Sequence, residues 1–162
     1  GGSFAITACK KDAPYKENSA VISWMMEEEL RMGLNTIEPY RQFAERVEAH
    51  KVSLISLLDK LKNDGKKIIG YGASTKGNVL LQYCGISTQY LDAIAEVNEQ
   101  KFGSYTPGTL IPIISEQEAK AMKPDYLFVL PWHFRNNILG REKEYRASGG
   151  KFIFPLPFIE IV

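Results

Sequence analysis

A short run of glycines and hydroxyl residues is the part of the sequence whose residue types could do chemistry. Residues 68–78 read IIGYGASTKGN, so an apolar run leads into three glycines, two hydroxyl side chains and a lysine. Glycine lets the backbone come close to an anion, and a helix that begins here points free N–H groups and the positive end of its dipole at that anion. A phosphate group is the ligand that this arrangement favours.

The glycine loop matches neither of two standard phosphate-binding patterns. The dinucleotide pattern G-x-G-x-x-G needs a third glycine where Thr75 stands. The P-loop pattern, placed on Gly72 and Gly77, needs a lysine where Asn78 stands. A strand-to-helix turn that uses glycine only for packing is the alternative, but two hydroxyls beside a lysine favour an anion site.

Two polar residues follow the next apolar run along the chain. Glu96 lies 24 residues after Gly72, near the place of a ribose-binding acid in a nucleotide fold, and Asn98 follows it closely. Ligands of open α/β sheets bind at the carboxyl ends of the strands, where such residues gather. A solvated strand end is the alternative for Glu96.

A histidine and a polar loop stand near the ends of later apolar runs. His133 lies between Trp132 and Phe134, a setting that favours a structural or site-lining role over a catalytic one. The loop 101–109, KFGSYTPGT, carries hydroxyls, an aromatic residue and two glycines. It could close over a ligand, or it could simply connect two strands.

Alternating strands and helices must position these residues. The pattern after Lys66 predicts an α/β fold with a parallel sheet of about five strands, joined by right-handed crossovers. Ser115 and Glu118 form a capping-box pattern at the start of one helix. The strands are predicted at 67–71, 90–97, 108–114, 125–132 and 150–157, and the helices at 76–85, 115–122 and 134–148.

The first 65 residues have a different pattern. Residues 3–9 form a lone strand-like run, which suits the last strand of a preceding domain, and the initial GGS is either a tag scar or native. The polar residues 10–19 are predicted to form a linker. Ser19 is predicted to be the N-cap of a helix that ends near Gly33. A longer helix follows and stops at 63–65. The pair forms an arm that packs on another domain or covers the chain's own sheet.

Composition bounds the function. The chain has 162 residues, 44% of them hydrophobic and 24% charged, with a formal net charge of +1. Such a balance predicts no nucleic-acid partner, and no apolar stretch approaches the length of a membrane span. Cys9 and Cys84 are too few and too far apart for a disulfide scaffold or a zinc site. They suit reduced thiols in a cytoplasmic protein.

Four longer segments resemble the C-terminal domain of S-adenosylmethionine-dependent sugar C-methyltransferases, which act on nucleotide-linked keto-deoxysugars. These segments read GYGASTKGNVLLQYCGI, YTPGTLIPIISEQEA, KPDYLFVLPWHFRNNI and GGKFIFPLP. The resemblance spans most of residues 1–162 and implies a Rossmann-like three-layer domain over 66–162. It also implies that residues 1–65 hold the terminal strand of a methyltransferase domain that is missing here, followed by a helical arm.

The resemblance implies a division of labour. The family carries zinc in an N-terminal cysteine-rich module and S-adenosylmethionine in a central domain, and neither cofactor nor a metal is expected in this fragment. The diphosphate of a nucleotide sugar, possibly TDP-linked, would be bound by Gly72, Ala73, Ser74, Thr75, Lys76, Gly77 and Asn78. The nucleoside or sugar would be bound by Glu96, Asn98, Tyr105 and His133.

Three hypotheses follow. In the first, the chain is the substrate-binding domain of such a methyltransferase, partnered by the upstream domain of the same chain and inactive alone. No catalytic residue is assigned, and His133 is the candidate base because His50, the other histidine, lies on the helical arm. The second is an NAD(P)-binding enzyme domain, which Thr75 at the third glycine position disfavours. The third is a non-catalytic module whose arm mediates association.

Overall fold

The computed structural model describes residues 5–162, and two units emerge from their contacts, one reaching to His50 and one spanning Lys51–Val162. The predicted domain boundary at residue 65 was drawn from sequence pattern alone and stays a prediction. Part of the lone strand predicted over 3–9 lies outside the described residues, and residues 5–9 have no regular secondary structure.

The first unit contains α1 (Ser19–Arg31) and the first half of α2 (Glu38–Asn63). The two predicted helices are therefore present, but Asn18, not Ser19, occupies the N-cap position of α1, and it makes no side-chain capping bond. No residue of α1 is buried. Large apolar side chains are exposed along this helix: Val21, Ile22, Trp24, Met25, Met26 and Leu30.

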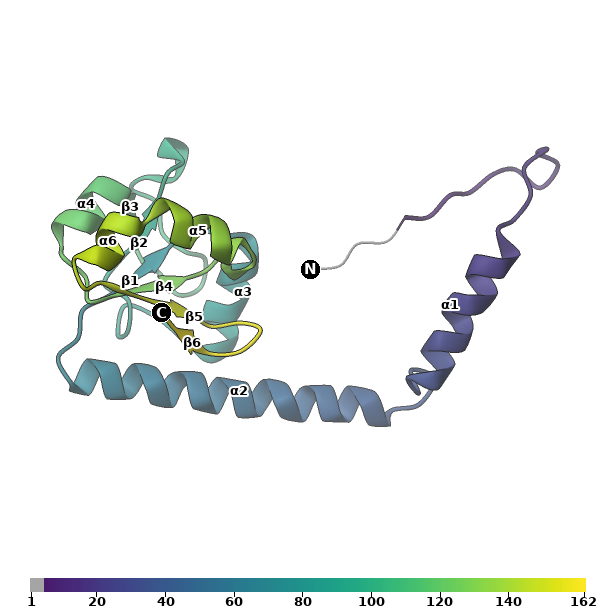
Figure 1. The fold of residues 1–162 in the computed structure, drawn as a ribbon, viewed down its shortest axis with the longest axis horizontal. Helices are drawn as coiled ribbons and strands as arrows, with labels where there is room; N and C mark the ends of the chain where they lie inside the picture. The colour runs from purple at the N-terminus through teal and green to yellow at the C-terminus, as the bar shows by residue number, and fades with distance from the viewer. Residues whose placement is uncertain (1–4) are drawn as a thin grey trace. The chain divides into compact units, whose positions relative to one another are not determined.

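A six-stranded sheet forms the centre of the second unit, with the strand order β3-β2-β1-β4-β5-β6 (Figure 1). The first five strands are parallel, as predicted, and β6 runs antiparallel to β5. The sixth strand, only two residues long, was not predicted. The strands are β1 (Ile68–Tyr71), β2 (Ile94–Glu96), β3 (Ile113–Ser115), β4 (Tyr126–Val129), β5 (Lys151–Phe154) and β6 (Glu160–Ile161).

The helix predicted over 76–85 is present at its predicted length as α3, whereas the other two connecting helices are shorter than the sequence pattern predicts. The predicted helix over 134–148 is a 3₁₀ turn and two short helices that meet at Glu142, whose backbone is not helical. The predicted capping box is confirmed, since Ser115 accepts from the Glu118 N–H and Glu118 accepts from the Ser115 N–H. The helices are α3 (Thr75–Cys84), α4 (Glu116–Ala121), α5 (Arg135–Arg141) and α6 (Lys143–Ala147), with 3₁₀ turns η1 (Glu99–Lys101) and η2 (Trp132–Phe134).

The sheet of the second unit is buried on both faces, which makes three layers. Alternate side chains of each strand point to opposite faces, so Ile68 and Ile69 enter different clusters. On one face α4 and α5 contribute Ala119 and Ile138, and Figure 1 shows α4, α5 and α6 gathered on one side of the sheet. The other face is covered by α3 and by the second half of α2.

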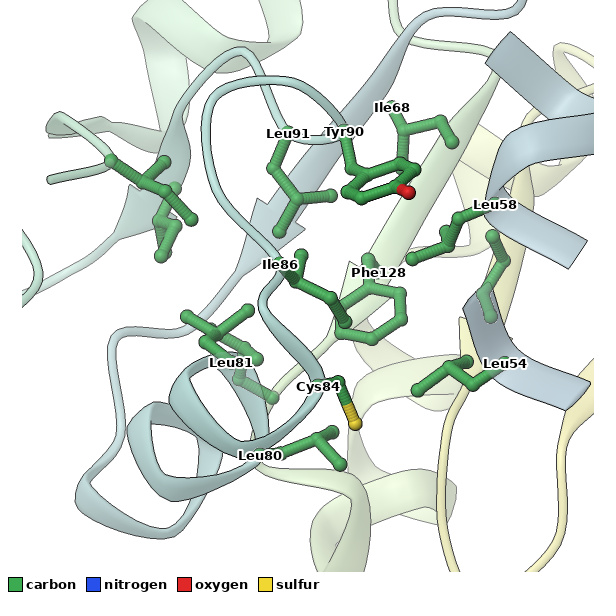
Figure 2. Packing of buried hydrophobic residues seen from close by; sticks show 14 of the residues in the cluster. Leu54, Leu58, Ile68, Leu80, Leu81, Cys84, Ile86, Tyr90, Leu91 and Phe128 are labelled. Carbon is green, nitrogen blue, oxygen red and sulfur yellow. The ribbon is translucent and has the colours of Figure 1, made fainter. Parts of the chain in front are cut away.

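The second half of α2 is part of this core. Figure 2 shows Leu54 and Leu58 pointing toward Phe128 of β4, and all three side chains are fully buried. The helix ends in the predicted glycine cap: Gly65 is left-handed, and the N–H groups of Gly65 and Lys66 donate to carbonyls of the last turn. This half of α2 therefore covers the chain's own sheet, one of the two roles that the sequence left open.

Replacement of Leu58 by alanine tests that role. Leu58→Ala is expected to lower the free energy of unfolding by about 2–5 kcal/mol, because it leaves a cavity in a packed core. Val52→Ala, on the same helix but 67% exposed, is the matched control and should change it by less than about 0.5 kcal/mol. Urea denaturation measures both. Equal, small effects would mean that this half of α2 is a detachable arm.

Candidate functional site

The glycine loop joins β1 to α3 at the carboxyl edge of the sheet, as predicted. Gly72 has a φ of +80°, and a Cβ atom there would lie 2.8 Å from Cγ of Pro131. Only glycine fits this position, because the conformation and the space both exclude a side chain. Ser74 then caps α3 by accepting a 3.0 Å hydrogen bond from the Gly77 N–H.

Gly77 brings the start of α3 against the end of β4. A Cβ atom at this position would lie 2.4 Å from Cβ of Leu130, so the glycine is needed for packing. The backbone N–H groups of Thr75 and Lys76 have no acceptor in the part of the chain that the structure describes. These two groups can therefore donate to an anion at the helix N-terminus.

The Glu96 carboxylate ties this loop to the end of β2. Its Oε2 accepts from the Ala73 N–H at 3.0 Å and from Nζ of Lys101 at 3.2 Å. Its Oε1 accepts from the N–H groups of Val97, at 2.8 Å, and Asn98, at 3.0 Å. Each carboxylate oxygen thus has two donors within the protein, which fills its acceptor capacity.

These donors set the ionisation of the carboxylate. Burial alone disfavours the charged form, but the N–H groups of Asn98 and Val97 and the Lys101 ammonium outweigh it, so the pKa of Glu96 is lowered. Lys101 also donates to the Ala73 carbonyl at 2.8 Å. Glu96 therefore stays charged at neutral pH and holds both the loop and the lysine in place.

Two cavities meet at this loop, on either side of it. The larger has a volume of about 490 Å³ and the smaller about 280 Å³. Both are lined by Ala73, Ser74, Thr75 and Lys101. An anion at the α3 N-terminus would therefore lie where the two cavities adjoin.

A network of polar side chains around the buried Tyr71 and Glu142 contributes Tyr71, Glu116 and Arg141 to the wall of the larger cavity. The Tyr71 hydroxyl donates to Glu142 at 2.9 Å, and Arg141 contacts the Tyr71 hydroxyl, Glu116 and Glu142. Lys120 pairs with Glu142 at 3.1 Å. Burial, and then the Glu142 acceptor, raise the pKa of the Tyr71 hydroxyl well above its ordinary value. The tyrosine is therefore a neutral donor, and Arg141 is held by two carboxylates.

The structure brings together part of the predicted residue set. The larger cavity is lined by Gly72, Ala73, Ser74, Thr75 and Glu96, and Asn78 joins Ala73, Ser74 and Thr75 at the smaller one. Neither of these two cavities is lined by Lys76, Gly77, Asn98, Tyr105 or His133. The ligand roles of all these residues stay predictions.

The residues outside the cavities have local roles. Asn98 caps η1 by accepting from the Gln100 N–H at 3.1 Å. Lys76 is exposed on α3, and Tyr105 is 62% exposed. The ring centroid of the exposed His133 lies 4.3 Å from that of Phe134 and 6.1 Å from that of Trp132, so this histidine contacts both of its aromatic neighbours.

Sequence reasoning did not select Arg141, which lines the larger cavity. Lys101 and Thr106 also line the cavities, and they were predicted only as members of the loop 101–109. Arg141 lies one turn after Asn137 and Ile138 on α5, and all three residues line the larger cavity.

Glu96 stands where nucleotide folds place a ribose-binding acid at the end of the second strand. Both of its oxygens already accept two hydrogen bonds within the protein, so in this conformation it offers no free acceptor to a ribose hydroxyl. Among residues 5–162, no group of three His, Cys, Asp or Glu side chains could hold a metal, and no helix could span a membrane.

Replacement of Glu96 tests its role as a tie. The pKa of Glu96 is lower in the folded protein than in the unfolded chain. The charged carboxylate therefore contributes its full share to the free energy of unfolding above the unfolded pKa of about 4.3, and this share is lost as pH falls through the folded pKa. Glu96→Gln is therefore expected to cost about 1–3 kcal/mol at pH 7, and less in acid. Urea denaturation across pH measures this, with the exposed Glu99→Gln as control. A pH-independent difference would contradict the tie.

Comparison with known proteins identifies the family of this chain. The family described as C-methyltransferase C-terminal domain matches residues 1–157. The C-methyltransferase NovU of Streptomyces niveus is 36% identical over 157 residues, which cover 97% of this chain and 37% of that relative. The match spans the glycine loop, both cavities and the sheet that positions them, and the resemblance noted in the sequence is confirmed. The chain belongs to the C-methyltransferase C-terminal domain family.

Proposed function

We propose that this chain binds the nucleotide diphosphate-linked keto-sugar on which a C-methyltransferase acts, and that it does not transfer the methyl group by itself. The single observation that carries the proposal is the pair of cavities that adjoin at the N-terminus of α3. A nucleotide sugar has the matching form, because a diphosphate joins its nucleoside at one end to its sugar at the other.

The diphosphate lies across the loop in this proposal. The N–H groups of Thr75 and Lys76 and the hydroxyl of Thr75 supply donors, and Lys101 supplies a charge at the border of both cavities. Lys101 is already paired with Glu96, but its side chain is 42% exposed, so it can face an anion as well. Glu96 itself has a structural role, since its oxygens have no acceptor capacity left.

The rest of the reaction belongs to a longer protein. This chain covers 37% of the length of its methyltransferase relative, and the family implies S-adenosylmethionine in the parent protein. We place the donor and the base in an upstream methyltransferase domain, where a base removes the proton next to the ketone and the enolate takes the methyl group. The residues of this chain bind and orient the sugar. The proposed setting is the cytoplasm, and Cys9 and Cys84 are not joined in a disulfide.

The exposed apolar side chains of α1 could contact the same upstream methyltransferase domain. Trp24, Met25 and Met26 are each about half exposed, and α1 buries none of its residues. Solvent-exposed apolar groups at this density mark a protein contact. The contact that we propose is with the upstream domain of a longer chain.

The nicotinamide alternative has less support. A dinucleotide fingerprint needs a free acid at the end of β2, and Glu96 is committed to Ala73 and Lys101. The missing third glycine, where Thr75 stands, points the same way.

Lysine variants test the diphosphate site. TDP or UDP should raise the melting temperature, because a ligand that binds only the folded state stabilises it. Lys101→Gln is expected to weaken TDP binding about tenfold, the scale of one charged hydrogen bond. Lys76→Gln, on the exposed face of α3, should weaken it less than about threefold.

Calorimetry measures the affinities. Denaturation without ligand shows whether Lys101→Gln also destabilises the fold, since this variant loses the contact with Glu96. A larger loss in Lys76→Gln would favour the sequence-based assignment of Lys76 and leave Lys101 a structural role. Absence of any TDP or UDP binding would refute the proposed function.

The isolated chain is expected to show no methyl transfer. Holding two reactants together contributes up to roughly 7–11 kcal/mol in well-oriented cases, and this chain holds only one of them. Radiolabelled S-adenosylmethionine and a TDP-linked keto-deoxysugar provide the assay, and calorimetry should detect no saturable binding of the donor. Label in the sugar would place a base in this chain, with His133 as the first residue to replace.

A further inference from the structure

A salt bridge on the wall of the larger cavity keeps hydrogen-bonding capacity for a ligand. Glu116 and Arg141 pair with each other and line this cavity, and their side chains are 23% and 49% exposed. The pair uses Oε1 of Glu116 and Nη2 of Arg141. Oε2 of Glu116 and Nη1 of Arg141 have no partner among the residues that the structure describes. The salt bridge therefore offers one acceptor and one donor group to a ligand.

The guanidinium of Arg141 is held in place by the rest of the polar network. Its Nε donates to Oε1 of the buried Glu142 at 3.2 Å, and its Nη2 also contacts the Tyr71 hydroxyl. Glu142 is fixed in turn, because it accepts from the Tyr71 hydroxyl at 2.9 Å and pairs with Lys120 at 3.1 Å. A side chain held in this way loses little rotamer freedom when a ligand binds, so Nη1 is a preorganised donor.

The charges of this network cancel, which bears on the kind of ligand group that the salt bridge can bind. Two carboxylates, those of Glu116 and Glu142, face the two cations Arg141 and Lys120. A phosphate would meet no net positive charge here. A neutral hydroxyl can donate to the carboxylate or accept from the guanidinium. Neighbouring hydroxyls of a sugar ring therefore match the pair better than a second anion does.

Apolar side chains near the salt bridge suit the body of a sugar ring. Phe134, which precedes α5, and Ile138, which lies within it, line the same cavity as Arg141. A sugar ring has C–H groups on its faces and hydroxyls at its edge. Such a ring can contact the apolar side chains and the polar pair at the same time.

We propose that Glu116 and Arg141 bind hydroxyl groups of a sugar ring of the ligand, and that Glu142 positions Arg141 for this contact. The inference rests on the proposed function. Glu142 does not itself line the larger cavity, so its effect on the ligand passes through Arg141. The ring is either the ribose of the nucleotide or the hexose attached to it. Both present the same hydroxyl chemistry, and the choice of ligands in the test distinguishes them.

The test measures binding by calorimetry on the whole chain with three ligands that differ in hydroxyl groups. UDP-glucose carries those of both rings, UDP carries those of ribose alone, and 2′,3′-dideoxy-UDP carries neither set. Glu116→Gln and Arg141→Gln are each expected to weaken binding of the recognised ligand about tenfold, the scale of one hydrogen bond to a charged group. Both variants should bind 2′,3′-dideoxy-UDP as the wild type does.

A control on α6 accompanies these variants. Arg146 is exposed and lines neither of the two cavities at the glycine loop, so Arg146→Gln should leave all three affinities unchanged.

The pattern of losses decides the outcome. A loss for UDP and UDP-glucose would place the ribose at the salt bridge, and a loss for UDP-glucose alone would place the hexose there. Equal losses for all three ligands, or no loss for any, would overturn the inference and leave diphosphate binding intact. If the wild-type chain binds none of the three and no pyrophosphate, the proposed function itself is refuted.

A double variant tests the positioning role of Glu142. Glu142→Gln should lower the ratio of the affinity for the recognised ligand to that for 2′,3′-dideoxy-UDP, whereas a purely structural role would leave this ratio unchanged. Because Glu142 acts through Arg141, Glu142→Gln combined with Arg141→Gln should show the same ratio as Arg141→Gln alone. A further fall of the ratio in the double variant would contradict the positioning role.

Discussion

The carboxylate of Glu96 is the constraint on which the site depends. It joins the glycine loop, the end of β2 and Lys101 through four hydrogen bonds that it accepts from backbone and ammonium donors. A charge this buried is tolerated only because every oxygen is satisfied. With the carboxylate in place, the Ala73 N–H is engaged, and the first backbone donors without an acceptor among the described residues are those of Ser74, Thr75 and Lys76.

The position of the two cavities depends on these hydrogen bonds of Glu96 and on one close packing contact. Gly77 allows α3 to rest directly on Leu130, which fixes the helix N-terminus above the border of β1 and β4. This border is where the strand order reverses direction, the place where open α/β sheets bind their ligands. The loop lines both cavities, and the walls of the larger one also carry Glu96, Glu116 and Arg141.

A second buried carboxylate, that of Glu142, lies at the point where the predicted last helix is broken. Its side chain turns inward to Tyr71 and Lys120, and the backbone leaves the helical conformation at that residue. The sequence pattern of 134–148 predicts one continuous helix, although Gly140 is a weak helix former two residues before the break. Arg141 is the last residue of α5 before the break, and it lines the larger cavity one turn after Asn137 and Ile138.

The sequence by itself determined the order of strands and helices, the parallel sheet, the loop at the β1–α3 junction and the cap at Ser115. These features depend on apolar periodicity and on contacts between near neighbours, both of which are visible in one dimension. Only the tertiary structure decided which polar side chains are free to meet a ligand. Glu96 and Asn78 both lie near the carboxyl edge of the sheet, yet packing satisfies both carboxylate oxygens of Glu96 and leaves Oδ1 of Asn78 without a partner among the described residues. Hydrogen-bond partners come from segments far apart in the chain, and so their pairing is set by the fold.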